Sequence, residues 1–103
     1  MGMDVLRDVV ERIEDFETGA SIFVPSEVDD ASLDTPVIVP TEPPASADAI
    51  SGYRYFLDTA TLANILSDLR NVIQSPSTAQ TLYVLNYYAE HDAYPDIEYV
   101  RRL

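Results

Sequence analysis

The chain has 103 residues, of which 18 are acidic, six are arginine and none is lysine, so its formal net charge at pH 7 is −12. Its length favours one domain with a modest core, and its hydrophobic fraction of 47% is typical of a globular protein. The charge makes nucleic acids and acidic membranes poor direct ligands, and the absence of cysteine excludes disulfides and thiolate metal sites.

No membrane-spanning or secretory segment is expected. The apolar runs fall well short of the roughly 18 residues that a transmembrane helix needs. Acidic side chains stand near the N-terminus, where a signal peptide would have basic residues followed by an apolar run. We therefore expect a cytoplasmic protein with a single domain over residues 1–103, whose oligomeric state the sequence leaves open.

Residues 3–16 have the spacing of an amphipathic helix. Its apolar side would comprise Val5, Leu6, Val9, Val10, Ile13 and Phe16. On the opposite side, acids recur at steps of four, three and four residues, at Asp4, Asp8, Glu11 and Asp15. Asp4 is placed to cap the start of this helix, and Gly19 lies just past its end. The pattern predicts an acidic stripe along one helix.

Three short segments rich in β-branched or aromatic residues predict strands, at 20–25, 35–40 and 53–57. Residues 26–34, between the first two strands, predict a loop, and residues 41–52, rich in proline and serine, predict another. The first loop holds four acids: Glu27, Asp29, Asp30 and Asp34. Because both loops flank the middle strand, we expect them near each other at the edge of a sheet.

The second half of the chain predicts two longer helices. The first runs over about 59–74 with a cap at Asp58 or Thr59, and the second runs over about 76–91 and is apolar almost all round. Alternating apolar residues in 96–100 predict a weak final strand. The predicted fold class is therefore α+β, in the order α-β-β-β-α-α-(β), with a short, mostly antiparallel sheet packed against helices.

The acidic side chains of the first half are the leading candidates for binding a partner. Residues 1–50 hold 12 acids and two arginines, for a net charge of −10, whereas residues 51–103 hold six acids and four arginines. Charge gathered in this way attracts a positively charged macromolecule. The candidate partner-binding residues are Asp4, Asp8, Glu11, Asp15, Glu27, Asp29, Asp30 and Asp34. A plain solvated surface, adaptation to a salty cytoplasm or the codon bias of a GC-rich genome fits the same composition.

No catalytic residue, cofactor site or metal site is predicted. His91 is the one histidine and is flanked by two acids, but side chains adjacent in sequence diverge on a helix. A histidine near the negative end of a helix is the commoner explanation. The chain has no Gly-rich phosphate loop, no G-x-S-x-G and no H-E-x-x-H. We therefore expect a protein that is not an enzyme.

Tyrosine is concentrated near the C-terminus. Five of the seven tyrosines fall within residues 83–99. Tyrosine has an apolar body and a polar tip, so it suits both small cores and protein interfaces. We expect buried or half-buried roles for most of them, with one or two exposed.

Two stretches of the second half form motifs. The first is residues 52–57 (GYRYFL), followed by a helix, and the second runs from Leu85-Asn86-Tyr87-Tyr88 through His91-Asp92-Ala93-Tyr94. They resemble a group of small acidic bacterial domains of unassigned function, which look like the immunity proteins of toxin systems. The resemblance implies a similar order of helices and strands in the first half. Because its motifs are apolar and structural, it implies a fold and transfers no binding residue.

Three functional hypotheses follow. The first is an inhibitor or immunity-type protein that covers a basic surface of a toxin, a nuclease or another nucleic-acid-handling enzyme. The second is a DNA mimic, such as an anti-restriction or anti-CRISPR protein of a phage or mobile element, whose carboxylates replace phosphates. The third is an acidic domain of unassigned cellular role with a salt-adapted surface. We favour the first, because the charge of residues 1–50 would speed association with a basic protein.

Overall fold

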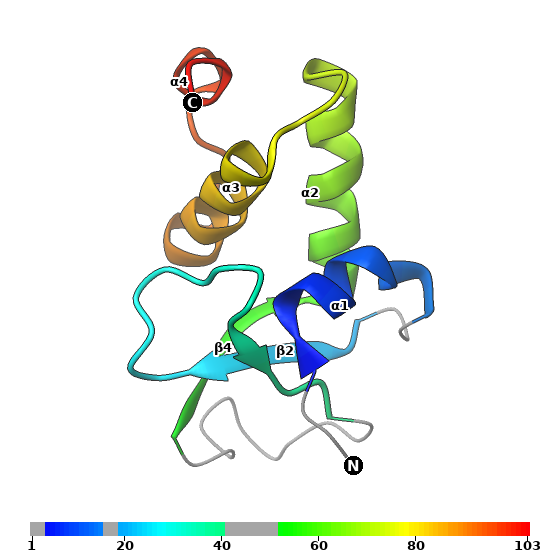
Figure 1. The fold of residues 1–103 in the computed structure, drawn as a ribbon, viewed down its shortest axis with the longest axis vertical. Helices are drawn as coiled ribbons and strands as arrows, with labels where there is room; N and C mark the ends of the chain where they lie inside the picture. The colour runs from blue at the N-terminus through cyan, green and yellow to red at the C-terminus, as the bar shows by residue number, and fades with distance from the viewer. Residues whose placement is uncertain (1–3, 16–18, 41–51) are drawn as a thin grey trace.

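The computed structural model describes residues 4–15, 19–40 and 52–103, which form an α+β fold with α2, α3 and α4 to one side of the strands (Figure 1). Within these residues the elements are β1 (Asp4–Val5), α1 (Leu6–Glu11), the 3₁₀-helix η1 (Ile13–Asp15), β2 (Ser21–Pro25), β3 (Pro36–Val37), β4 (Tyr53–Asp58), α2 (Thr59–Val72), α3 (Thr78–His91) and α4 (Ile97–Arg101). The predicted fold class is confirmed. The loop predicted for residues 41–52 lies outside the described residues, apart from its last position.

The strands form two antiparallel pairs, β2 with β4 and β1 with β3. A bridge between Phe23 and Ile38 joins the two pairs. The Phe23 N–H donates to Ile38 O at 2.8 Å, and the Ile38 N–H donates to Phe23 O at 3.0 Å. The three predicted strands therefore exist, although the second has ladder pairing only over Pro36–Val37 and this bridge.

A bulge in β4 places two consecutive side chains in the core. Ile22 pairs with Leu57 and Phe23 pairs with Tyr55, so Phe56 is the extra residue. Phe56 and Leu57 are both buried, at 2% and 4% exposure, whereas Tyr55 is 43% exposed. The strand therefore contributes an aromatic and an aliphatic side chain to the same core, which strict alternation would not allow.

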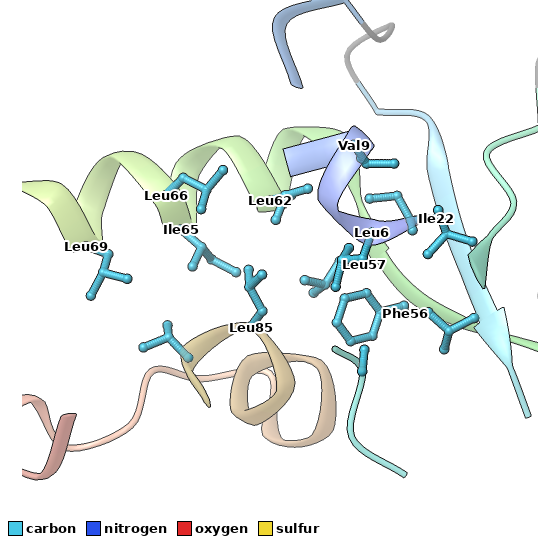
Figure 2. Packing of buried hydrophobic residues seen from close by; sticks show 14 of the residues in the cluster. Leu6, Val9, Ile22, Phe56, Leu57, Leu62, Ile65, Leu66, Leu69 and Leu85 are labelled. Atoms are coloured by element: carbon cyan, nitrogen blue, oxygen red, sulfur yellow. The ribbon is translucent and has the colours of Figure 1, made fainter. Parts of the chain in front are cut away.

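One core joins the helices to the strands. Asp58 caps α2, since its Oδ1 accepts a hydrogen bond from the Thr61 N–H at 2.6 Å, as predicted. The buried face of α2 meets Leu85, which points from α3 toward α2 (Figure 2). The buried cluster includes Leu6, Val9, Ile22, Val24, Val37, Phe56, Leu57, Leu62, Ile65, Leu66, Leu69, Val84, Leu85 and Val100. The core thus draws on elements from both halves of the chain.

The helix predicted over residues 3–16 is wrong in its extent. β1 pairs with β3, so the backbone at Asp4 is extended and α1 begins only at Leu6. α1 ends at Glu11, and after Arg12 the chain forms η1 instead of continuing the helix. Strand pairing, a tertiary contact, overrides the helical spacing at the start of this segment. Of the predicted acidic stripe, only Asp8 and Glu11 lie on α1.

The two caps predicted for that helix are also wrong. The N-cap position is Val5 rather than Asp4, and the Val5 N–H donates to Asp8 Oδ2 at 3.2 Å. Gly19 has a φ of 88°, a conformation that glycine adopts readily, but α1 ends well before it.

The predicted final strand, residues 96–100, is instead part of a helix, α4. Asp96 starts this helix, because its Oδ1 accepts from the Glu98 N–H at 3.1 Å. Val100 is completely buried, whereas Tyr99 is 49% exposed. The inward residues, Ile97 and Val100, are three positions apart, which is helical spacing rather than the alternation of a strand.

Candidate functional site

The loop between β2 and β3 is held in place by hydrogen bonds to side chains from two elements that are distant in sequence. Asn86 of α3 accepts from the Ala31 N–H through Oδ1 at 2.8 Å and donates to Ala31 O through Nδ2 at 2.9 Å. Arg54 of β4 donates through Nη2 to Val28 O at 2.7 Å and to Asp29 O at 3.3 Å. The acidic side chains of this loop are therefore presented from a fixed backbone.

The far end of the same loop is attached to the start of α1. The Leu6 N–H donates to Thr35 O, and the Arg7 N–H donates to Leu33 O, both at 2.9 Å. The Arg7 guanidinium also lies 2.9 Å from Asp34 Oδ1, with the two side chains 45% and 79% exposed. An ion pair this exposed contributes little to stability, but it offsets the charge of Asp34.

Two adjoining hollows lie between the β2–β3 loop and α3, with volumes of about 360 Å³ and 480 Å³. Asp30, Asn86 and Glu90 line both hollows, so the two form one open groove, called the groove from here on. Asp29 and Arg54 border the smaller hollow. Three carboxylates thus surround the groove, one from α3 and two from the loop.

An aromatic wall closes the α3 side of the larger hollow. Tyr83, Tyr87 and His91 line it and recur every four residues, so they share one side of the helix. The ring centroids of Tyr83 and Tyr87 are 6.0 Å apart, and those of Tyr87 and His91 are 4.3 Å apart. Tyr99 of α4 extends the row, with its centroid 5.0 Å from that of Tyr83.

The groove has carboxylates at its rim and tyrosine hydroxyls along its aromatic wall. Burial, followed by repulsion from the neighbouring Tyr99 and Tyr87 hydroxyls, raises the pKa of Tyr83, so its hydroxyl stays protonated. Glu90 Oε2 is 3.8 Å from His91 Nε2, and both side chains are about half exposed or more. Within residues 4–15, 19–40 and 52–103, no hydrogen bond or ion pair engages the carboxylates of Asp29 and Asp30. These carboxylates are available to an external cation.

The predicted site residues fall into two groups. Asp29 and Asp30 line the groove, whereas Asp8 is engaged in capping α1 and Glu11 is exposed on that helix. In Figure 1 the β2–β3 loop extends to one side beneath α3, while α1 leads to the other side. The loop acids and the α1 acids therefore do not form a single continuous ladder.

The remaining predicted residues lie outside the groove. Glu27 is exposed on the same loop without lining either hollow, and Asp34 pairs with Arg7. The backbones of Asp4 and Asp15 belong to β1 and η1, and their side chains lie outside what the structure describes.

Glu90 and Asn86 were missed by the sequence analysis. Glu90 belongs to the half of the chain with the smaller net charge, and only the packing of α3 against the loop brings it next to Asp30. The aromatic wall did have a signal in the sequence, because Tyr83, Tyr87 and His91 follow a four-residue repeat that places them on one side of a helix. No pattern in the sequence indicates that Asn86 binds Ala31.

The fold and the groove define a small acidic α+β domain with a candidate binding groove between a loop and a helix. Residues 3–97 match the family described as "Domain of unknown function (DUF7716)", and the chain belongs to that family. The expected likeness to domains of unassigned function is confirmed. No curated protein and no solved structure matches the chain.

Among the described residues, no helix has the length and apolar character to cross a bilayer, and no three His, Asp or Glu side chains are grouped to hold a metal ion.

Proposed function

We propose that this protein is a non-enzymatic binding module, an inhibitor or immunity-type protein that covers a basic surface of a toxin or a nucleic-acid-handling enzyme. The observation that carries the proposal is the groove, which Asp29, Asp30 and Glu90 line and which has tyrosine rings along one wall of its larger hollow. Interfaces are enriched in tyrosine, and complementary charge selects and orients the partner.

The charge of the whole chain supports this function as well. A net charge of −12 attracts a basic partner over distances of about a Debye length, roughly 8 Å at physiological salt. Steering of this kind raises association rates toward about 10⁸ M⁻¹s⁻¹ at low salt. Once docked, the partner's basic surface is unavailable to its own anionic substrate. Such an inhibitor would act in the cytoplasm, where its target would otherwise reach cellular nucleic acid.

The DNA-mimic hypothesis has less support from the structure. A mimic needs a ladder of carboxylates spaced like the phosphates of a duplex, one per roughly 1.7 Å of axis. α1 is six residues long and holds only Asp8 and Glu11 of the predicted stripe, and Asp8 contacts the Val5 N–H. The salt-adapted domain remains the third hypothesis, supported by composition alone.

Affinity capture followed by an inhibition assay tests the proposal. The immobilised protein is exposed to a lysate of its source cells at about 150 mM salt, beside an Asp30→Asn/Glu90→Gln double variant. A Glu11→Gln/Glu14→Gln double variant removes the same charge from α1 and η1 and serves as the matched control, since Glu11 and Glu14 are exposed outside the groove. The captured protein is then assayed with and without one equivalent of each variant.

We expect the wild type and the control to retain a basic protein and to inhibit its activity, and the groove variant to do neither. The proposal is wrong if the captured protein remains fully active in the stoichiometric complex, or if nothing basic is retained. Duplex DNA separates the two leading hypotheses. Any duplex displaces a DNA mimic from its target, whereas an immunity-type protein binds one enzyme and ignores related ones.

A further inference from the structure

We infer that the groove is a receptor for an arginine side chain of the partner, with the guanidinium stacked on the rings of Tyr87 and His91 and paired with the carboxylates of Asp30 and Glu90. The inference rests on the proposed function and adds the chemistry by which that site recognises its partner. It concerns the larger of the two hollows, the one that the aromatic wall closes.

The required groups border the same space. Asp30 comes from the β2–β3 loop and Glu90 from α3, so the two carboxylates approach the larger hollow from different elements. Tyr87 and His91, with ring centroids 4.3 Å apart, line that hollow too. Its volume of about 480 Å³ lies within the range of roughly 300–1,000 Å³ that is usual for ligand sites. A long side chain therefore fits beside both the rings and the acids.

Arginine suits these groups better than lysine does. The guanidinium is planar, stacks on aromatic faces and presents five N–H donors in a fork that matches carboxylates. The lysine ammonium is a compact, strongly hydrated point charge that gains less from a flat aromatic wall. A groove with acids alone would attract either cation, whereas acids beside rings favour arginine.

The chain itself already binds a guanidinium at the neighbouring part of this loop. Arg54 lines the smaller hollow, and its Nη2 donates to the backbone oxygens of Val28 and Asp29. This internal arginine uses backbone carbonyls and leaves the carboxylates of Asp29 and Asp30 available. The larger hollow is not lined by Arg54. An external arginine would therefore enter beside the internal one without displacing it.

Nuclear magnetic resonance titration with short peptides tests the inference without the natural partner. The probes are the blocked peptides Gly-Arg-Gly-Arg-Gly and Gly-Lys-Gly-Lys-Gly, added to ¹⁵N-labelled full-length protein at about 20 mM salt. We expect the arginine peptide to shift the backbone amides of residues 30–31 and 86–91 and to bind about threefold more tightly than the lysine peptide, because the planar guanidinium stacks on an aromatic face better than the strongly hydrated ammonium does.

Four variants locate the effect. Asp30→Asn/Glu90→Gln should weaken the arginine peptide about fivefold, because two exposed charge pairs are lost. The Glu11→Gln/Glu14→Gln control, with the same net charge, should change its affinity by less than twofold. Tyr87→Leu should abolish the preference for arginine, and Tyr87→Phe, which keeps the aromatic face, should retain it. The Tyr87→Phe result keeps the test valid if Tyr87→Leu fails to fold.

Equal affinity for the two peptides, or equal weakening by the groove variant and the control, would overturn the arginine site. That result would leave the proposed function in place if capture and inhibition still depend on Asp30 and Glu90. Conversely, the protein could prefer the arginine peptide while the captured protein stays active in the complex. That result would support the arginine site and contradict the proposed inhibitory function.

Discussion

Asn86 on α3 and Ala31 on the β2–β3 loop, 55 residues apart in sequence, are joined by a reciprocal pair of hydrogen bonds like those of paired strands. Ala31 is 3% exposed, so little water reaches its backbone while the Asn86 amide is in place. A third bond, from Asn86 Nδ2 to Leu82 O at 2.9 Å, fixes the side chain on its own helix. Asn86 thus holds the loop at the residue that follows Asp30, one of the acids of the groove.

Replacing Asn86 by alanine should therefore destabilise the protein. The substitution leaves the N–H and the carbonyl of Ala31 without a partner in a place that water hardly reaches, which costs about 1–3 kcal/mol. Urea denaturation followed by circular dichroism measures the loss. Hydrogen exchange should accelerate at the Ala31 amide more than at the amides of β2.

Asn64→Ala is the matched control, because Asn64 is exposed on α2. Alanine is the better helix former, so this variant should be as stable as the wild type or slightly more stable. If both variants have the same free energy of unfolding, Asn86 does not hold the loop, and the groove has another source of order.

The elements that the sequence predicts well depend on local signals. Residues 59–72 form α2 because Asp58 caps the first turn and apolar residues recur at helical spacing. β4 can be predicted in the same way, because its aromatic-rich run of residues ends at this cap. For these two elements, propensity, pattern and tertiary packing agree, so nothing overrides the local prediction.

The elements that the sequence misplaces have two causes, which are a partner far along the chain and a segment too short for its period to be recognised. The backbone at Asp4 is extended because it meets Val37, and helical spacing cannot reveal that pairing. For α4 the signals were present, in a cap at Asp96 and in the three-residue step from Ile97 to Val100, but five residues are too few for the two periods to be distinguished. The groove is harder still to predict from the sequence, because only tertiary packing brings Asp30 and Glu90 to the same hollow.

The two acids of α1 should differ in their effect on stability. Asp8 Oδ2 accepts from the Val5 N–H at the start of the helix, so Asp8→Ala should cost about 0.5–1.5 kcal/mol. Glu11 is exposed near the end of the helix, where a negative charge opposes the helix dipole, so Glu11→Ala should be neutral or slightly stabilising. Thermal melts of the two variants at about 20 mM salt measure the difference. Equal melting temperatures would mean that the contact to Val5 contributes nothing.

Truncation of Leu85 should be among the most damaging changes to the core. Leu85 is completely buried and points from α3 toward α2 (Figure 2), so Leu85→Ala should cost about 2–5 kcal/mol. Leu103, at 46% exposure, provides the same chemical change at the surface, and Leu103→Ala should cost less than about 0.5 kcal/mol. Chemical denaturation of both variants gives the comparison. A cost below about 1 kcal/mol for Leu85→Ala would show that α3 is not anchored through this side chain.

Alkaline pH should specifically weaken the contact between α2 and the segment after α3. The Tyr94 hydroxyl donates to Asp68 Oδ2 at 2.6 Å. Burial first, and then this hydrogen bond and the Asp68 charge, raise the pKa of Tyr94 to about 12. In the unfolded chain the pKa of tyrosine is about 10, so the folded state holds this proton more tightly. The resulting stability is fully present below pH ~10 and is lost as the pH rises toward about 12.

Tyr94→Phe isolates this effect, because it removes the titrating hydroxyl and keeps the ring. We expect the variant to be less stable than the wild type at pH 8, and the difference in their free energies of unfolding to shrink between pH 10 and 12. General alkaline repulsion acts on both proteins and cancels in the difference. Asp68→Asn provides the second measurement, because removal of the negative charge should lower the pKa of Tyr94 in an absorbance titration of tyrosinate. If the difference between wild type and Tyr94→Phe stays constant across this range, the hydroxyl is not preferentially protonated in the folded state, and the Asp68 contact does not act as described.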